Sequence, residues 1–112
     1  MSTNVSFINM KGGVGKTTLA MQVALAAETA GLRVLAVDLD PQSNLSQAVL
    51  GAKKYVELLK NDSPTVIQIF EGYMPTTNAR PSPTPASVDD VIRKGVGPAY
   101  KSRLDLIPSR LE

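Results

Sequence analysis

The order of apolar and polar positions predicts two strands around a helix in the first third of the chain. Val5 to Asn9 is a short apolar run between polar residues and a glycine loop, which predicts a buried strand. From Lys16 to Ala30 strong helix formers dominate, apolar residues recur every three or four positions, and Gly31 supplies the stop. Arg33 to Asp38 is typical of a strand covered on both faces. Together these segments predict a right-handed βαβ unit with parallel strands.

The signals are weaker in the rest of the chain. Three short segments predict helices: NLSQAVLG, KYVELLK and PTVIQIFEG. Residues 75–87 hold four prolines among small polar residues, which predicts an extended loop. We interpret this loop as a tolerated surface insertion and not as a ligand for an SH3-type domain, because short proline-rich stretches are common in loops. Ser87 is the expected N-cap of a helix in VDDVIRKG, and Leu104 to Ile107 predicts a further strand.

The amino-acid composition limits the kinds of site and reaction that this chain can support. The chain has 112 residues with 43% hydrophobic, which suits one small domain or a piece of one. The absence of cysteine and histidine excludes disulfides, thiolate or imidazole zinc sites and Ser-His-Asp catalysis. The net charge of +2 is too slight to imply a nucleic-acid or membrane partner. We find neither a signal-peptide pattern nor an apolar stretch of the roughly 18 to 20 residues that cross a bilayer, so we expect a cytoplasmic protein.

Residues 9–18, NMKGGVGKTT, form a glycine-rich loop between the first strand and the helix. A phosphate chain needs several converging hydrogen-bond donors, and glycine lets the backbone amides come close enough. Gly12, Gly13 and Gly15 would wrap a β-phosphate, and the helix N-terminus would direct its free amides at the same oxygens. A turn that merely links strand to helix is the alternative. We favour the phosphate loop because the flanking strand and helix are the context it requires.

The end of this loop carries the charged and hydroxyl groups that phosphate chemistry uses. Lys16 would neutralise charge on the β- and γ-phosphates, and the Thr17 hydroxyl would ligate Mg²⁺. Thr18 is the next donor and would face the α-phosphate. The common pattern G-x-x-x-x-G-K-[ST] is matched at its end, whereas Met10 occupies its first glycine position. The motif is therefore a deviant one.

A second polar motif, VDLDPQSN, follows the Arg33 to Asp38 strand. Ligands of open α/β sheets bind at the carboxyl ends of the strands, so Asp38 and Asp40 should face the phosphate loop. One carboxylate could hold the metal's water shell and the other could orient the attacking water. The alternative is that Asp40 and Pro41 form a turn and Asn44 an N-cap. Because the glycine loop is present, we favour the interpretation in which Asp38 and Asp40 belong to a phosphate and metal site.

KGGVGKT together with DLDPQ resembles the deviant Walker A ATPases of the ParA and MinD group, and DPQ followed by Asn44 is more similar to the ParA branch. LDLIPS, residues 104–109, is similar to the strand that precedes the Walker B region in ParA-like proteins. The resemblance implies a three-layer α/β/α P-loop NTPase fold with a mostly parallel sheet, truncated before the Walker B strand. In that fold the Walker B strand lies beside the P-loop strand, so we expect a gap in the sheet and a fragment of a longer protein.

The resemblance implies that residues 1–112 are the N-terminal part of a single P-loop ATPase domain. Its parts are residues 1–74, the nucleotide-binding βαβ unit and following helices, the proline-rich loop 75–87, and residues 88–112, a helix and a strand. The resemblance also implies catalytic roles for two lysines and an aspartate. Lys11 would reach the phosphates of the other subunit across an ATP-sandwich dimer, and Lys16 would serve its own nucleotide. Asp40 would orient the hydrolytic water. The alternative for Lys11 is a solvated surface lysine.

The resemblance also implies the cofactors and partners. Mg²⁺ would be held by Thr17 and, through water, by Asp38. The ATP site would comprise the whole loop: Lys11, Gly12, Gly13, Val14, Gly15, Lys16, Thr17 and Thr18. We expect a nucleotide-dependent homodimer that serves plasmid or chromosome segregation, with non-specific DNA and a ParB-like protein bound through regions outside these residues. The alternatives are a nucleotide-responsive scaffold with little turnover and a MinD-like ATPase that selects membrane sites.

Overall fold

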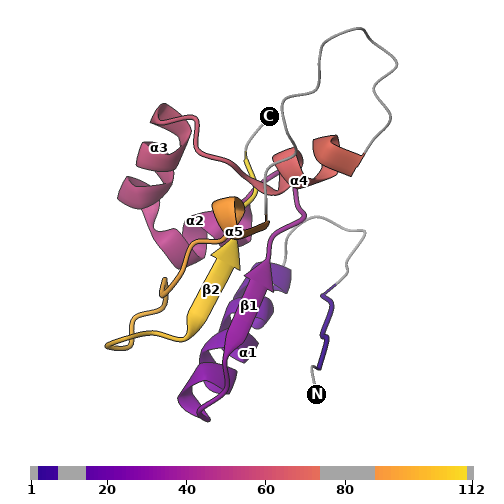
Figure 1. Cartoon of the computed structure of the whole chain (residues 1–112). Coiled ribbons are helices and arrows are strands. Elements are labelled where there is room, and N and C mark those ends of the chain that lie inside the picture. The colour runs from indigo at the N-terminus through magenta and orange to yellow at the C-terminus, as the bar shows by residue number, and fades with distance from the viewer. Residues whose placement is uncertain (1–2, 8–14, 74–87, 111–112) are drawn as a thin grey trace, which may run out of the picture.

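The computed structural model describes residues 3–7, 15–73 and 88–110 as an α/β fold around a parallel sheet (Figure 1). The elements in chain order are α1 (Lys16–Thr29), β1 (Val34–Val37), α2 (Asn44–Leu50), α3 (Ala52–Lys60), α4 (Val66–Tyr73), α5 (Val88–Val91) and β2 (Leu104–Ile107). In Figure 1, α1 lies behind the sheet and α5 lies in front of β2. Helices therefore lie on both faces of the sheet, as the expected three-layer fold requires.

The sheet consists of β1 and β2, which pair in parallel from Val34 opposite Leu104 to Val37 opposite Ile107. The predicted strand at Leu104 to Ile107 is confirmed with the same bounds. On its other edge β2 meets Arg93 in an antiparallel bridge, in which Arg93 and Leu106 exchange N–H···O bonds of 2.7 and 2.8 Å. Because the two strands of a parallel pair run in the same direction and Val37 lies opposite Ile107, the residues after β1 and those after β2 leave the sheet at the same edge.

The predicted helices are present. α1 ends as expected before Gly31, whose φ of 91° lies in the left-handed region that glycine enters without steric cost. Helices α2, α3 and α4 coincide with the three predicted segments to within two residues at each end, and α5 is a single turn. The expected N-cap Ser87 and the proline-rich residues 75–87 lie outside the described residues. No helix in the described part of the chain is long and apolar enough to span a membrane.

The prediction of a first strand is wrong for the residues that the structure describes. Residues 3–7 form no strand, the side chain of Val5 is 63% exposed, and the segment lies apart from β1 in Figure 1. The remainder, Ile8 and Asn9, lies outside the described residues. A strand is stabilised by hydrogen bonds to a neighbouring strand, and the described sheet contains only β1 and β2, with residues 3–7 paired to neither. The described sheet is therefore the β1–β2 pair, and residues 3–7 lie apart from it.

The expectation that β1 is covered on both faces is also wrong. Val34 and Ala36 are half-buried, whereas Leu35 is 51% exposed and Val37 is exposed beside it. Alternate residues of a strand point to opposite faces, so one face of β1 is largely open. The opposite strand is better covered, since Leu104 and Leu106 are buried. Its last residue belongs to a core cluster with α4 and α5, formed by Val66, Val91 and Ile107.

Candidate functional site

The N-terminus of α1 carries, among the described residues, no group that compensates the positive end of the helix dipole. Its N-cap is Gly15, with a φ of 84°, and neither a capping side chain nor an acidic residue in the first turn compensates the positive end of the helix. Instead the first residue is Lys16. A cation there opposes the helix dipole by about 0.3 to 1 kcal/mol, whereas a bound anion would satisfy both the dipole and the lysine. This end of α1 therefore fits a phosphate group.

Asp40, in the loop that follows β1, reaches the first residue of α1. Its Oδ2 lies 3.5 Å from the Nζ of Lys16, 24 residues away in sequence, and both side chains are partly buried. Its Oδ1 accepts a 2.9 Å hydrogen bond from the Gln42 N–H, which closes a turn. The turn interpretation is therefore confirmed, but the N-cap of α2 is Ser43 and not Asn44. The turn and the contact with Lys16 exist together.

Asp38 lies inside the fold, with 3% of its surface exposed. Its Oδ2 accepts hydrogen bonds from the N–H of Ser46 at 2.9 Å and from the Ser46 hydroxyl at 2.7 Å, and its Oδ1 accepts one from the Asp40 N–H at 3.1 Å. In this conformation both carboxylate oxygens are engaged by protein donors. The water-shell role of Asp38 stays a prediction.

Two serines that the sequence did not single out belong to the same cluster. Ser46 is fully buried in α2, and Ser109 follows β2 with 3% exposed. The Ser109 N–H donates to the Ser46 hydroxyl at 2.8 Å, and the Ser109 hydroxyl donates to the Asp40 carbonyl at 2.8 Å. The sequence carried no signal for these contacts, because they join residues 63 and 69 positions apart.

The structure describes some of the remaining predicted site residues and not others. Thr17 is half-buried and Thr18 exposed on the first turn of α1, whereas residues 11–14 lie outside the described residues. Within the described ranges, no three acidic side chains gather closely enough to hold a metal ion. Mg²⁺ usually keeps several waters and is held by one or two protein oxygens with substrate phosphates, so the Thr17 hydroxyl suits such a site without a protein cage.

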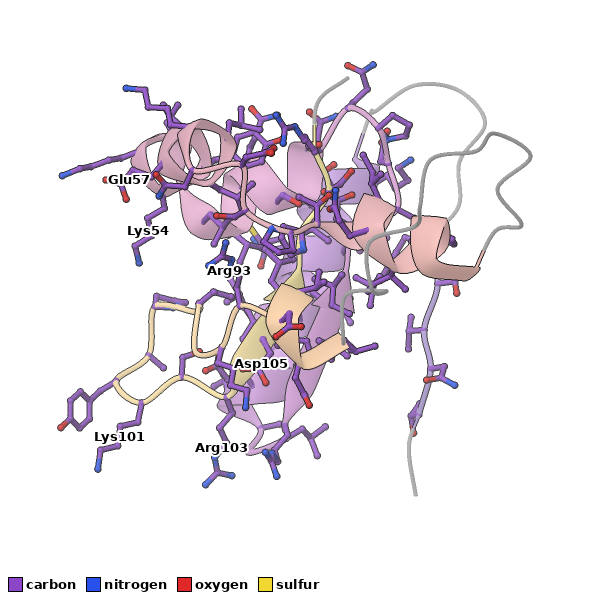
Figure 2. All side chains as sticks on the ribbon, turned by 45° about the horizontal axis from the view of Figure 1, so that its top comes forward. Lys54, Glu57, Arg93, Lys101, Arg103 and Asp105 are labelled. Carbon is purple, nitrogen blue, oxygen red and sulfur yellow. The ribbon has the colours of Figure 1, made fainter. Side chains whose placement is uncertain are left out.

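A separate hollow of about 560 Å³ lies between α3 and the segment that precedes β2. Figure 2 shows Lys54 and Glu57 of α3 and Arg93 of that segment, all three of which line the hollow. Its lining includes neither Lys16 nor Asp38 nor Asp40. The candidate phosphate site at the start of α1 is thus distinct from this hollow.

The fold and the site define a class of protein, the P-loop NTPases: a helix with a lysine at its uncapped N-terminus faces an aspartate at the end of a parallel strand. Residues 2–112 match the family described as "AAA domain", and the chain belongs to this family. The curated relatives place it with the ParA-type partition ATPases, as their N-terminal portion. No solved structure gives a significant match.

Three relatives illustrate the likeness. The chromosome-partitioning ATPase Soj of Treponema pallidum is 45% identical over 49 residues, which cover 44% of this chain and 19% of Soj. A virulence plasmid ParA family protein of Chlamydia muridarum is 57% identical over 47 residues, 41% of this chain and 17% of the relative. A putative replication protein A of Sinorhizobium fredii is 32% identical over 96% of this chain and 22% of its own length. The chain thus spans about a fifth of these relatives.

Ser43 is a strained position beside the site, and its replacement by glycine should stabilise the protein. Ser43 has a φ of 58°, and its fully buried hydroxyl has no hydrogen-bond partner in the described structure. A left-handed conformation costs a non-glycine residue roughly 1 to 2 kcal/mol, part of which glycine's larger backbone entropy offsets. We therefore expect Ser43→Gly to raise the free energy of unfolding in urea by about 1 kcal/mol.

Ser43→Ala is the matched control, because it removes the hydroxyl and keeps the strained backbone. It should be less stable than Ser43→Gly. A Ser43→Gly protein that unfolds at lower urea concentration than the wild type would contradict this account.

Proposed function

We propose that this protein binds and hydrolyses ATP as a ParA-type partition ATPase, and that its ATP-dependent dimer serves plasmid or chromosome segregation. The observation that carries the proposal is the contact between Lys16 at the start of α1 and Asp40 after β1. A cation that neutralises the phosphates and a polar group that orients the hydrolytic water are two of the protein groups that phosphoryl transfer to water uses. The family and its partition members supply the biological context.

In this proposal Lys16 holds the β- and γ-phosphates of its own subunit and Asp40 orients the water that attacks. When bound, Mg²⁺ supplies charge neutralisation at the phosphates, with Thr17 as its protein ligand. The backbone of Gly12, Gly13, Val14, Gly15 and Thr18 provides the surrounding donors. Lys16 and Asp40 contact each other in the structure at 3.5 Å, a long distance for a hydrogen bond, so a phosphate group could take the place of the carboxylate at Nζ.

Lys11 has a different role in the proposal. Lys16 already serves the nucleotide of its own subunit, so we assign Lys11 to the nucleotide of the second subunit. Such a cation delivered in trans couples hydrolysis to dimerisation. We further propose a cytoplasmic protein whose DNA and ParB-like partners bind through segments outside these 112 residues.

Removal of either the Lys16 or the Asp40 side chain should strongly lower ATP turnover. In the protein made from its complete reading frame, we expect Asp40→Ala to lower kcat about 10²- to 10⁴-fold and Lys16→Ala about 10²-fold or more. Lys53→Ala, in an exposed lysine of α3, is the matched control and should hydrolyse ATP like the wild type. Phosphate release at saturating ATP measures kcat for the wild type and the three variants. Equal turnover in all of them would refute the proposed ATPase.

Replacement of Lys11 separates a switchable dimer from a scaffold. We expect Lys11→Ala to lower ATP turnover by about 10³- to 10⁵-fold, because the trans cation is lost, while ATP still binds to the single subunit. Phosphate release and sedimentation velocity with and without ATP measure the two properties. Slow wild-type turnover with ATP-dependent association that Lys11→Ala disrupts would favour the scaffold. Normal dimerisation and hydrolysis by Lys11→Ala would make Lys11 a surface lysine.

A further inference from the structure

Behind Asp40 lies a closed circuit of buried hydrogen bonds, which we call the Asp40 anchor: Asp38, Ser46 and Ser109. The Ser46 hydroxyl is its centre. It donates to Asp38 Oδ2 at 2.7 Å and accepts the N–H of Ser109 at 2.8 Å. All three residues are at least 97% buried. Hydrogen bonds in such surroundings are strong, and an unpaired partner is costly, so the circuit holds a single arrangement.

The Asp40 anchor fixes the backbone of Asp40 from both sides. The Asp40 N–H donates to Asp38 Oδ1 at 3.1 Å, and the Asp40 carbonyl accepts the Ser109 hydroxyl at 2.8 Å. Both peptide groups that flank the Asp40 side chain are therefore restrained. The side chain itself is held by the Gln42 N–H on Oδ1, which leaves Oδ2 toward Lys16.

The partners of this circuit come from three elements. Asp38 continues β1, and its N–H donates to the carbonyl of Ile107 in β2 at 3.0 Å. Ser46 belongs to α2, and Ser109 follows β2. The register of the two strands thus brings Ser109 to the loop that carries Asp40, and α2 supplies the hydroxyl between them.

We propose that Ser46 and Ser109 are positioning residues for ATP hydrolysis, which act through Asp38 and the Asp40 backbone to aim the Asp40 carboxylate. In this conformation Asp38 serves as the internal acceptor of the circuit. The inference rests on the proposed function for its kinetic consequence. Its structural part, the restraint of the loop at residues 39–43, stands independently. A displacement of about 1 Å in a reacting group can cost about 10²-fold in rate, so such restraint matters.

Kinetics of three serine variants test the positioning role in the protein made from its complete reading frame. We expect Ser46→Ala and Ser109→Ala to lower kcat about 10- to 100-fold while KM for ATP changes less than about twofold, since Lys16 and the phosphate loop remain. Ser102→Ala is the matched control. Its hydroxyl donates to Glu28 at 2.6 Å and accepts the amides of Gly97 and Leu104, so a similar set of hydrogen bonds is lost.

Ser102 precedes β2, at the end of the strand away from the site, where Figure 2 shows its neighbour Arg103. Ser102→Ala should therefore lower the urea midpoint like the other two variants and leave kcat unchanged. An equal loss of kcat in Ser102→Ala and Ser109→Ala would show a merely structural effect and overturn the proposal, as would normal kcat in Ser46→Ala and Ser109→Ala.

Amide hydrogen exchange without nucleotide gives a readout that does not depend on activity. Exchange at the amides of residues 39, 40, 42 and 43 should be faster in Ser46→Ala and Ser109→Ala and unchanged in Ser102→Ala. Unchanged exchange in all three variants would overturn the claim that the Asp40 anchor restrains the loop at residues 39–43. A wild-type protein without ATP turnover would refute the proposed function instead, and with it the kinetic part of the inference. The two failures are therefore distinguishable.

Discussion

The parallel register of β1 and β2 is the constraint on which the site depends. Val37 lies opposite Ile107, and one residue further the N–H of Asp38 donates to the Ile107 carbonyl. This places the loop after β1 beside the chain after β2, so that Asp40 and Ser109 meet although 69 residues separate them. A shift of one residue would turn every side chain of one strand to the other face and would separate the two segments. The position of Asp40 is thus determined by the pairing of β1 with β2.

Local sequence patterns were sufficient to predict most of the helices and strands. The helix from Lys16 and its stop at Gly31 follow from residue propensities within one segment, and the strand Leu104–Ile107 has the predicted bounds because its apolar run is short and sharply delimited. The first strand failed for the opposite reason. The run that begins at Val5 has strand composition, but a strand also needs hydrogen bonds to a neighbouring strand, and residues 3–7 pair with neither β1 nor β2.

The candidate site likewise combines features that the local sequence predicts with features that depend on contacts between distant segments. The glycine loop and the two aspartates could be singled out from the sequence because their chemistry is carried by residue types at fixed spacing. The inward orientation of Asp38, the left-handed Ser43 and the circuit through Ser46 depend on contacts between distant segments, so no local pattern could predict them. Lys16 combines both levels: its place at a helix N-terminus is local, whereas its contact with Asp40 is a product of the fold.

The central claim is that Lys16 and Asp40 act on one reacting centre, and a double-mutant cycle on kcat tests it most directly. Lys16→Ala, Asp40→Ala and the double variant are compared with the wild type in phosphate release at saturating ATP. Groups that act as a unit are strongly non-additive, so the account predicts that the double variant is no slower than the slower single variant. Rate losses that simply multiply in the double variant would show two independent effects and would contradict a shared site.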